Sequence, residues 1–100
     1  MSLKVVTICG SMKFAKEMID IAGELEKKQG WVVIQCIYNL NPSEISEAEM
    51  KNVVDAHWKK IDISDAIYVV NIDGYIGTAT TNEIEYAKLK GKEVIYHEKI

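Results

Sequence analysis

The stretch LKVVTICGSMKF, residues 3–14, is where the fold of the chain is first decided. Residues 3–9 are largely apolar on both alternating faces, which is typical of a central parallel strand covered by helices on each side. Gly10 allows the backbone to turn sharply and to approach a ligand closely. Apolar residues then recur with helical spacing, so the stretch predicts a strand, a glycine turn and a helix in direct succession.

The same alternation continues along the rest of the sequence. Further strands are predicted over 31–37, 66–72 and 93–97, and helices over 13–29, over a segment that starts with a capping box at Ser46 and Glu49, and from Thr81 or Asn82 to Lys90. This order predicts the α/β class: a three-layer, flavodoxin- or Rossmann-like fold with four parallel strands in the order 2-1-3-4 and helices on both faces. Residues 1–100 are expected to form one domain.

Composition narrows the classes of partner. The net charge is −3 and there is no basic run, so duplex nucleic acid is not an expected partner. No apolar run approaches the roughly 20 residues that span a bilayer, and the N-terminal residues are too few and too β-like for a signal peptide. We therefore expect no membrane partner and a cytoplasmic location.

The two cysteines, Cys9 and Cys36, each stand alone within apolar stretches. Isolated cysteines of this kind are usually buried reduced thiols. No CxxC or HxxxH spacing supports zinc. We expect neither a metal nor a cofactor.

The functional site is expected beyond the carboxyl ends of the strands. In open α/β sheets ligands bind at the switch point between neighbouring crossovers, which here lies between the first and third strands. Two unusual loops meet there, residues 10–13 and residues 73–81. The backbone amides of Ser11 to Lys13 open a helix and offer an anion or hydroxyl site, to which Lys13 adds a charge. The alternative is a plain turn in which Ser11 caps the helix.

Glu83 is the carboxylate that best fits this crevice. It is predicted in the first turn of the last helix, where it would point toward the switch point. The alternative is an ordinary acidic residue favoured there by the helix dipole.

Together these motifs resemble the nucleoside 2-deoxyribosyltransferase family, including its Rcl-type deoxynucleoside 5′-monophosphate N-glycosidases. The family's first turn is C-G-S-[I/M]-[R/K], its third strand opens with A-D, and its catalytic helix carries E-x-x-x-A-x-x-x-G-K. The matching residues here are CGSMK at 9–13, Ser64 and Asp65, and Glu83, Ala87, Gly91 and Lys92, with Tyr86 matching some members. The likeness extends over nearly the whole chain.

The resemblance implies a double displacement at a deoxyribose. Glu83 would attack C1′ as the base leaves, and a second base or water would then release the sugar from the glutamate ester. Asp73 is the leading candidate to protonate the leaving base, with His57 and Asp62 as further candidates. The residues expected to hold the substrate are Gly10, Ser11, Met12, Lys13, His57, Asp62, Tyr75, Gly77 and Thr78.

Several alternatives stay open. His57 stands where the Rcl-type branch has an acidic residue that holds the ribose, and it also fits an exposed position on an amphipathic helix. Tyr75 fits either stacking on a base or packing over the core. The loop before Glu83 also resembles that of LOG-type phosphoribohydrolases, which cleave ribonucleotides. The family's transferases continue beyond the fourth strand and complete a neighbouring subunit's site, so hydrolysis is expected before transfer.

The partners expected are a small nucleoside or nucleotide and further copies of the same chain. A four-stranded sheet leaves edges that need cover, and Trp31, Trp58 and the methionines supply apolar surface for a homodimer or higher homo-oligomer. A nucleotide-binding module without chemistry is the rival from another class, because the fold alone does not separate the two.

Overall fold

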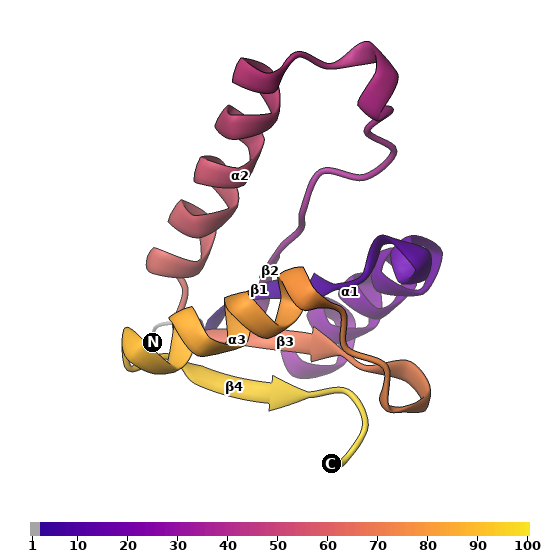
Figure 1. The fold of residues 1–100 in the computed structure, drawn as a ribbon. Coiled ribbons are helices and arrows are strands. Elements are labelled where there is room, and N and C mark those ends of the chain that lie inside the picture. Colours follow the sequence, from indigo (N-terminus) through magenta and orange to yellow (C-terminus); the bar gives the residue numbers. More distant parts are fainter. Residues whose placement is uncertain (1–2) are drawn as a thin grey trace.

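The structure, a computed structural model that describes residues 3–100, has the predicted alternation of strands and helices (Figure 1). The strands are β1 Val5–Gly10, β2 Val32–Ile34, β3 Ala66–Val70 and β4 Glu93–Tyr96, and the helices are α1 Ala15–Gln29, α2 Glu47–Asp62 and α3 Thr78–Leu89. Short 3₁₀ turns occupy Met12–Phe14, Pro42–Glu44 and Ile72–Gly74. All strand pairs are parallel and the sheet order is β2-β1-β3-β4, which confirms the predicted fold class and strand order.

The two faces of the sheet are covered by different helices. Alternate residues of β1 and β3 point to opposite faces because the side-chain period of a strand is two. One face packs on α1 through Val6, Ile8, Phe14, Met18, Ala22, Ala66, Tyr68 and Val70. The other packs on α2 and α3 through Cys9, Ile61, Ile67, Val69, Ile84 and Ala87. Helices therefore lie on both faces, as predicted, and β1 is an inner strand with apolar neighbours on each side.

The second strand is shorter than predicted. The apolar run over 31–37 predicted a strand of that length, but only Val32–Ile34 pairs with β1. After Ile34 the chain leaves the sheet, and the carbonyl of Gln35 accepts a hydrogen bond from Lys60 of α2 at 2.9 Å. A run of β-forming residues at a sheet edge has one neighbour to pair with, so its propensity does not fix its length.

The last helix begins earlier than predicted. The expected start at Thr81 or Asn82 is wrong, because α3 already begins at Thr78 after an extended Gly77. The amide and hydroxyl of Thr81 both donate to the carbonyl of Gly77, at 2.9 and 3.0 Å, so Thr81 lies inside the first turn. Threonines have modest helix propensity and favour caps, which is why the sequence placed the start too late.

Helix α2 leans away from the sheet, and the loop before it extends with it (Figure 1). Among its residues, all of which the structure describes, Ile61 alone is buried. The predicted capping box is confirmed. Ser46 Oγ accepts from the amide of Glu49 at 3.1 Å, and Glu49 Oε1 accepts from the amide of Ser46 at 2.8 Å.

The capping box predicts an acid-sensitive contribution to stability. Hydrogen bonding from Ser46 lowers the pKa of Glu49 below its ordinary value, which is about 4.3 in an unfolded chain. As the pH falls, the unfolded chain therefore binds more protons at this carboxylate than the folded chain does. The stability that the Glu49 carboxylate contributes above its unfolded pKa is lost as the pH falls through its lowered folded pKa. We expect the free energy of unfolding to fall less between about pH 6 and pH 3 in Glu49→Gln than in the parent protein. Urea unfolding at each pH, followed by circular dichroism, measures this free energy. Glu85→Gln on α3 is the control and should follow the parent; equal slopes for all three proteins would contradict the prediction.

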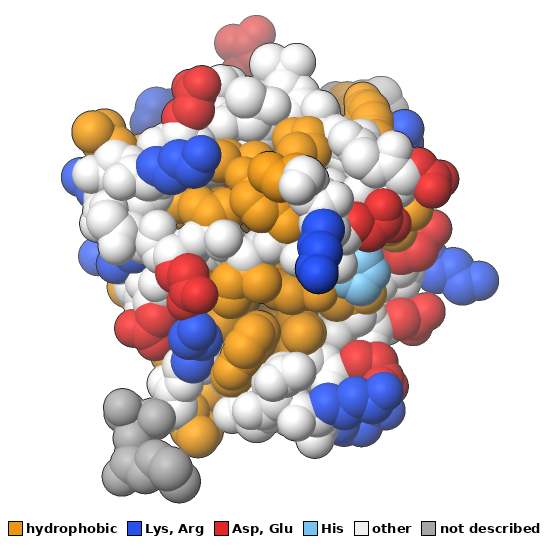
Figure 2. Space-filling view, turned by 90° about the horizontal axis from the view of Figure 1, so that it is seen from below, with side chains coloured by type: hydrophobic (Ala, Val, Ile, Leu, Met, Phe, Trp, Pro, Cys, Tyr) orange, Lys and Arg blue, Asp and Glu red, His pale blue; other side chains and the backbone are white. Residues whose placement is uncertain are grey.

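The surface seen from the β4 side combines apolar and charged side chains. Figure 2 shows apolar side chains gathered in the middle of this face, with lysines and acidic residues around them. β4 is an edge strand of the sheet, so its outer backbone groups face this side. Within residues 3–100, no helix combines the length and apolar character needed to cross a membrane.

Candidate active site

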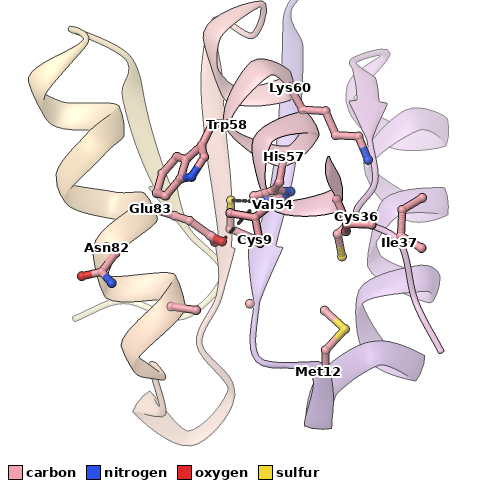
Figure 3. A pocket seen from close by; sticks show the side chains of 13 residues that line it. Cys9, Met12, Cys36, Ile37, Val54, His57, Trp58, Lys60, Asn82 and Glu83 are labelled. Atoms are coloured by element: carbon pink, nitrogen blue, oxygen red, sulfur yellow. Dashed lines mark hydrogen bonds and ion pairs between the residues drawn. The ribbon is translucent and has the colours of Figure 1, made fainter. Parts of the chain in front are cut away.

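A cavity of about 350 Å³ lies at the carboxyl end of β1, between α2 and α3 (Figure 3). Its size falls within the range of pockets that take small ligands. Four parts of the chain wall it: the end of β1 with the turn after it, the segment after β2, the middle of α2 and the start of α3. The lining residues are Cys9, Gly10, Met12, Cys36, Ile37, Val53, Val54, His57, Trp58, Lys60, Ala79, Asn82 and Glu83.

The glycine at the end of β1 is explained by packing. A Cβ atom at Gly10 would lie 2.9 Å from Met18 Sδ and 3.3 Å from the Cβ and carbonyl oxygen of Val70. Gly10 is not among the described residues with positive φ, so its role is close approach and not a left-handed turn. The absence of a side chain at Gly10 therefore lets α1 and β3 pack closely against the end of β1, beside the cavity.

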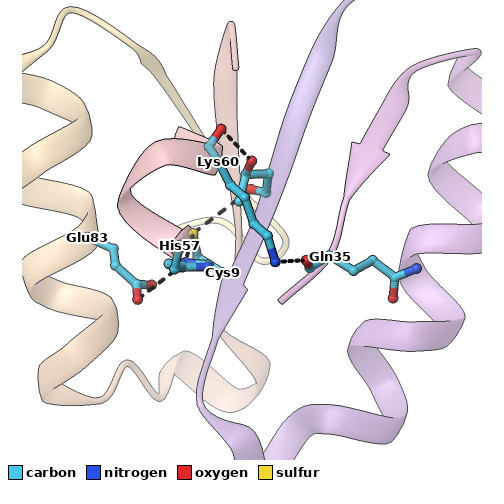
Figure 4. A network of polar contacts seen from close by, with 6 residues as sticks. Cys9, Gln35, His57, Lys60 and Glu83 are labelled. Carbon is cyan, nitrogen blue, oxygen red and sulfur yellow. Dashed lines mark hydrogen bonds and ion pairs between the residues drawn. The ribbon is translucent and has the colours of Figure 1, made fainter. Parts of the chain in front are cut away.

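A cluster of three polar side chains lies at the bottom of the cavity (Figure 4). Cys9 Sγ is 3.7 Å from His57 Nε2, and the same nitrogen is 3.4 Å from Glu83 Oε2. The side chains of His57 and Glu83 are only 15% and 17% exposed. One strand and two helices each contribute one member, so the cluster depends on the packing of α2 and α3 over β1.

The surroundings of Cys9 favour the protonated form of its thiol. Burial raises the pKa of Cys9 well above its ordinary value, and the negative charge of Glu83 raises it further. Cys9 is 1% exposed. Reactive cysteines need a lowered pKa and access to solvent, so the protein's own groups do not make Cys9 a nucleophile.

The early start of α3 changes the setting of Glu83. The sequence predicted Glu83 in the first turn, but it lies five residues after Thr78, in the second turn. Among the described residues of α3, the first turn holds no acidic side chain. The helix dipole acts mainly within the first turn, so it does not account for a carboxylate at this position. Glu83 instead points into the cavity, toward His57 (Figure 3).

The structure brings some of the predicted site residues together and leaves others outside. Gly10, Met12, His57 and Glu83 line the cavity. In the part of the chain that the structure describes, the following lie outside its lining: Ser11, Lys13, Asp62, Asp73, Tyr75, Gly77 and Thr78. The roles predicted for these seven residues stay predictions.

The two predicted loops do meet, beside the cavity. Lys13 Nζ lies 3.3 Å from the centre of the Tyr75 ring, a cation–π contact, and Phe14 packs edge-on against the same ring. Ser11 Oγ accepts from the amide of Lys13 at 3.3 Å, as a helix cap does. Gly77 and Thr78 form the start of α3.

Two of the predicted acids have other partners. Asp62 accepts a hydrogen bond from the hydroxyl of Tyr86, which raises the pKa of Tyr86 above its ordinary value. The ring of Tyr86 packs at 4.7 Å from that of Trp58, so Asp62 helps to hold a cavity wall from outside. Asp73 is exposed, and its amide donates to Glu98 Oε1 at 3.1 Å.

Sequence reasoning missed most of the apolar wall of the cavity. Val54 and Trp58 line the cavity from α2, and nothing in the sequence showed that this side of the helix faces a cavity. Lys60 lines the cavity too, and its Nζ reaches the Gln35 carbonyl. The other residues missed are Cys9, Cys36, Ile37, Val53, Ala79 and Asn82.

The chain matches no known family model, and no curated protein matches its sequence.

Proposed function

We propose that the chain cleaves or transfers the N-glycosidic bond of 2′-deoxynucleosides or their 5′-monophosphates, with Glu83 as nucleophile. The observation that carries the proposal is the position of Glu83. Its carboxylate lines the same cavity as Gly10, is 17% exposed and faces a space large enough for a sugar and base. A carboxylate held beside a cavity of this kind is the nucleophile that a retaining mechanism needs.

The chemistry takes two displacements. A carboxylate oxygen of Glu83 bonds to C1′ while the C1′–N bond breaks, and the electron pair of that bond leaves with the base, which takes up a proton. Water or a second base then attacks C1′, gives up a proton to solvent as the new bond forms, and displaces Glu83 with its electron pair. The apolar walls fit the flat face of a base, and Trp58 offers an aromatic surface for stacking.

His57 is the best placed of the three proton donors that the sequence offered. It lines the cavity and lies 3.4 Å from Glu83, whereas Asp62 and Asp73 lie outside the lining among the described residues. One imidazole between the nucleophile and the leaving group can hold the carboxylate and pass a proton to the base.

We expect His57→Gln to lower the rate of base release by about 100- to 10,000-fold, the usual contribution of a general acid. The measurement compares a natural base with a leaving group that needs no protonation. The rate should fall by a larger factor for the natural substrate. An equal fall in rate for both leaving groups would contradict the role of His57 as proton donor.

The proposal is tested by incubating the protein with the four deoxynucleosides, their 5′-monophosphates and the matching ribonucleotides, and measuring free base by chromatography. Base release from deoxy substrates supports the proposal, and exchange with an added base supports transfer. Release from ribonucleotides alone would replace it with the LOG-like activity. Binding without release would replace it with the nucleotide-binding module.

We also propose that the chain works in the cytoplasm and forms a homodimer. The cavity wall includes the half-exposed apolar side chains of Met12, Ile37 and Val54, so a second copy laid against this side would close the site. Sedimentation should show a species of twice the chain mass at micromolar concentration. A monomer over that range would contradict the dimer and leave the proposed chemistry in place.

A further inference from the structure

Three side chains with metal-binding atoms converge at the bottom of the cavity. They are Cys9 from β1, His57 from α2 and Glu83 from α3. Each offers one ligand atom, and the three atoms lie within 4.8 Å of one another. Sequence spacing predicted no metal, since local motifs reveal only ligands that lie near one another along the chain.

Two of the distances between these ligand atoms match those of a tetrahedral site. Zinc bonds of about 2.0–2.3 Å to nitrogen, oxygen and sulfur place neighbouring ligand atoms roughly 3.3–3.8 Å apart. Cys9 Sγ and His57 Nε2 are 3.7 Å apart, and His57 Nε2 and Glu83 Oε2 are 3.4 Å apart. Both neighbouring pairs of ligand atoms therefore have the spacing found around a single ion, and all three atoms lie within 4.8 Å of one another.

We propose that Cys9, His57 and Glu83 form a binding site for a divalent transition-metal ion of the zinc type. A thiolate and an imidazole favour Zn²⁺ or Co²⁺ over Mg²⁺ and Ca²⁺, which prefer sites made of oxygen. Three protein ligands leave a fourth position for water or a substrate atom, and that position faces the cavity.

The charges of the bound state balance. When the Sγ–metal bond forms, the thiol proton of Cys9 passes to solvent. One thiolate and one carboxylate then neutralise the two charges of the ion, so no net charge is added to a largely buried site. Because Cys9 lines the cavity although it is 1% exposed, the ion enters through the cavity.

Metal binding and the proposed glycosidic chemistry compete for one carboxylate. An oxygen of Glu83 that ligates a metal has less electron density for attack on C1′, so the loaded protein is expected to release base more slowly. The binding site itself rests on the geometry of the three ligands and not on that chemistry.

The test is a titration of the full chain with Co²⁺, followed by the absorption of a thiolate–cobalt bond and by its displacement with Zn²⁺. We expect one Co²⁺ per chain, with the charge-transfer band lost in Cys9→Ser and kept in Cys36→Ser, the other thiol of the cavity. Glu83→Gln should keep the band and weaken binding at least about tenfold, since even neighbours of metal ligands contribute that much. Circular dichroism checks that each variant is folded; if Cys9→Ser is not, Glu83→Gln and His57→Gln carry the test.

A band that survives in a folded Cys9→Ser or disappears in Cys36→Ser would overturn the site, as would the absence of stoichiometric binding at micromolar Co²⁺ and Zn²⁺. Unchanged affinity in both Glu83→Gln and His57→Gln would overturn it too. Base release by chelator-treated protein is measured in parallel. Base release by metal-free protein tests the proposed glycosidic activity alone. Failure of the metal site is therefore distinguishable from failure of the proposed activity.

Discussion

Glu83→Gln is expected to reduce base release by at least about a thousandfold while substrate binding persists. The amide keeps the size of the side chain and removes the negative charge that attacks C1′. Glu83 lies on a helix at the cavity wall and is partly exposed, so the fold should tolerate the change. Turnover is measured by chromatography of free base, and binding by calorimetry with the deoxynucleotide that the parent protein cleaves fastest.

Glu85→Gln is the matched control for this variant. Glu85 lies two residues further along α3, is exposed and is not part of the cavity lining. The control should keep the activity of the parent protein. An equal loss in both variants would point to a general effect of charge, and full activity in Glu83→Gln would remove Glu83 from the mechanism.

Ile61→Ala is expected to lower the free energy of unfolding by about 2–5 kcal/mol. Ile61 is fully buried among Cys9, Ile67 and Ile84, and it is the one buried side chain in the described helix α2. Its truncation removes apolar contacts and leaves a cavity beneath the end of that helix. In a domain of this size the melting temperature should fall by roughly 10–20 °C.

Ile63→Ala is the control that makes the same substitution at an exposed position. Ile63 has the same side chain two residues later but is 58% exposed, so the control should stay within about 0.5 kcal/mol of the parent. Urea unfolding at constant temperature measures both variants. Similar losses at the two positions would contradict the view that Ile61 anchors α2. Because α2 also carries His57, the Ile61 variant should lose base release along with stability.

The layered architecture could be predicted because its signals are local. Residues 3–9 and 66–72 are apolar on both faces, which only inner parallel strands require, and the capping box at Ser46 and Glu49 marks the start of α2. Each of these patterns is formed by residues that lie close together in the sequence. Strand order then followed from the short crossovers, since few arrangements satisfy right-handed connections.

Element boundaries were less predictable because tertiary contacts decide them. The threonines at 78, 80 and 81 have modest helix propensity, yet Gly77 and the buried Thr80 fix this segment as the first turn of α3. β2 ends early because, within residues 3–100, it is an edge strand that pairs with β1 on one side alone. In both places a preference worth a fraction of a kcal/mol per residue is overridden by packing.

The candidate site could be predicted from local signals only near the end of β1 and the first turns of α3, whereas His57 was reached through the family resemblance. Gly10 and Glu83 have such signals, and they line one cavity. Cys9, His57 and Trp58 come together through the tilt of α2, which depends on long-range packing. Asp62 and Asp73 are acids at plausible positions in the sequence, but the Asp62 carboxylate is held by the hydroxyl of Tyr86, and Asp73 lies in a turn whose backbone amide binds Glu98.

The most direct measurement is mass spectrometry of the protein quenched during turnover of a deoxynucleotide. A peptide carrying a deoxyribosyl group, located by fragmentation on Glu83 and not on the neighbouring Glu85, is the predicted result. Base release without any sugar-bearing peptide, or with the sugar on another residue, would contradict the account.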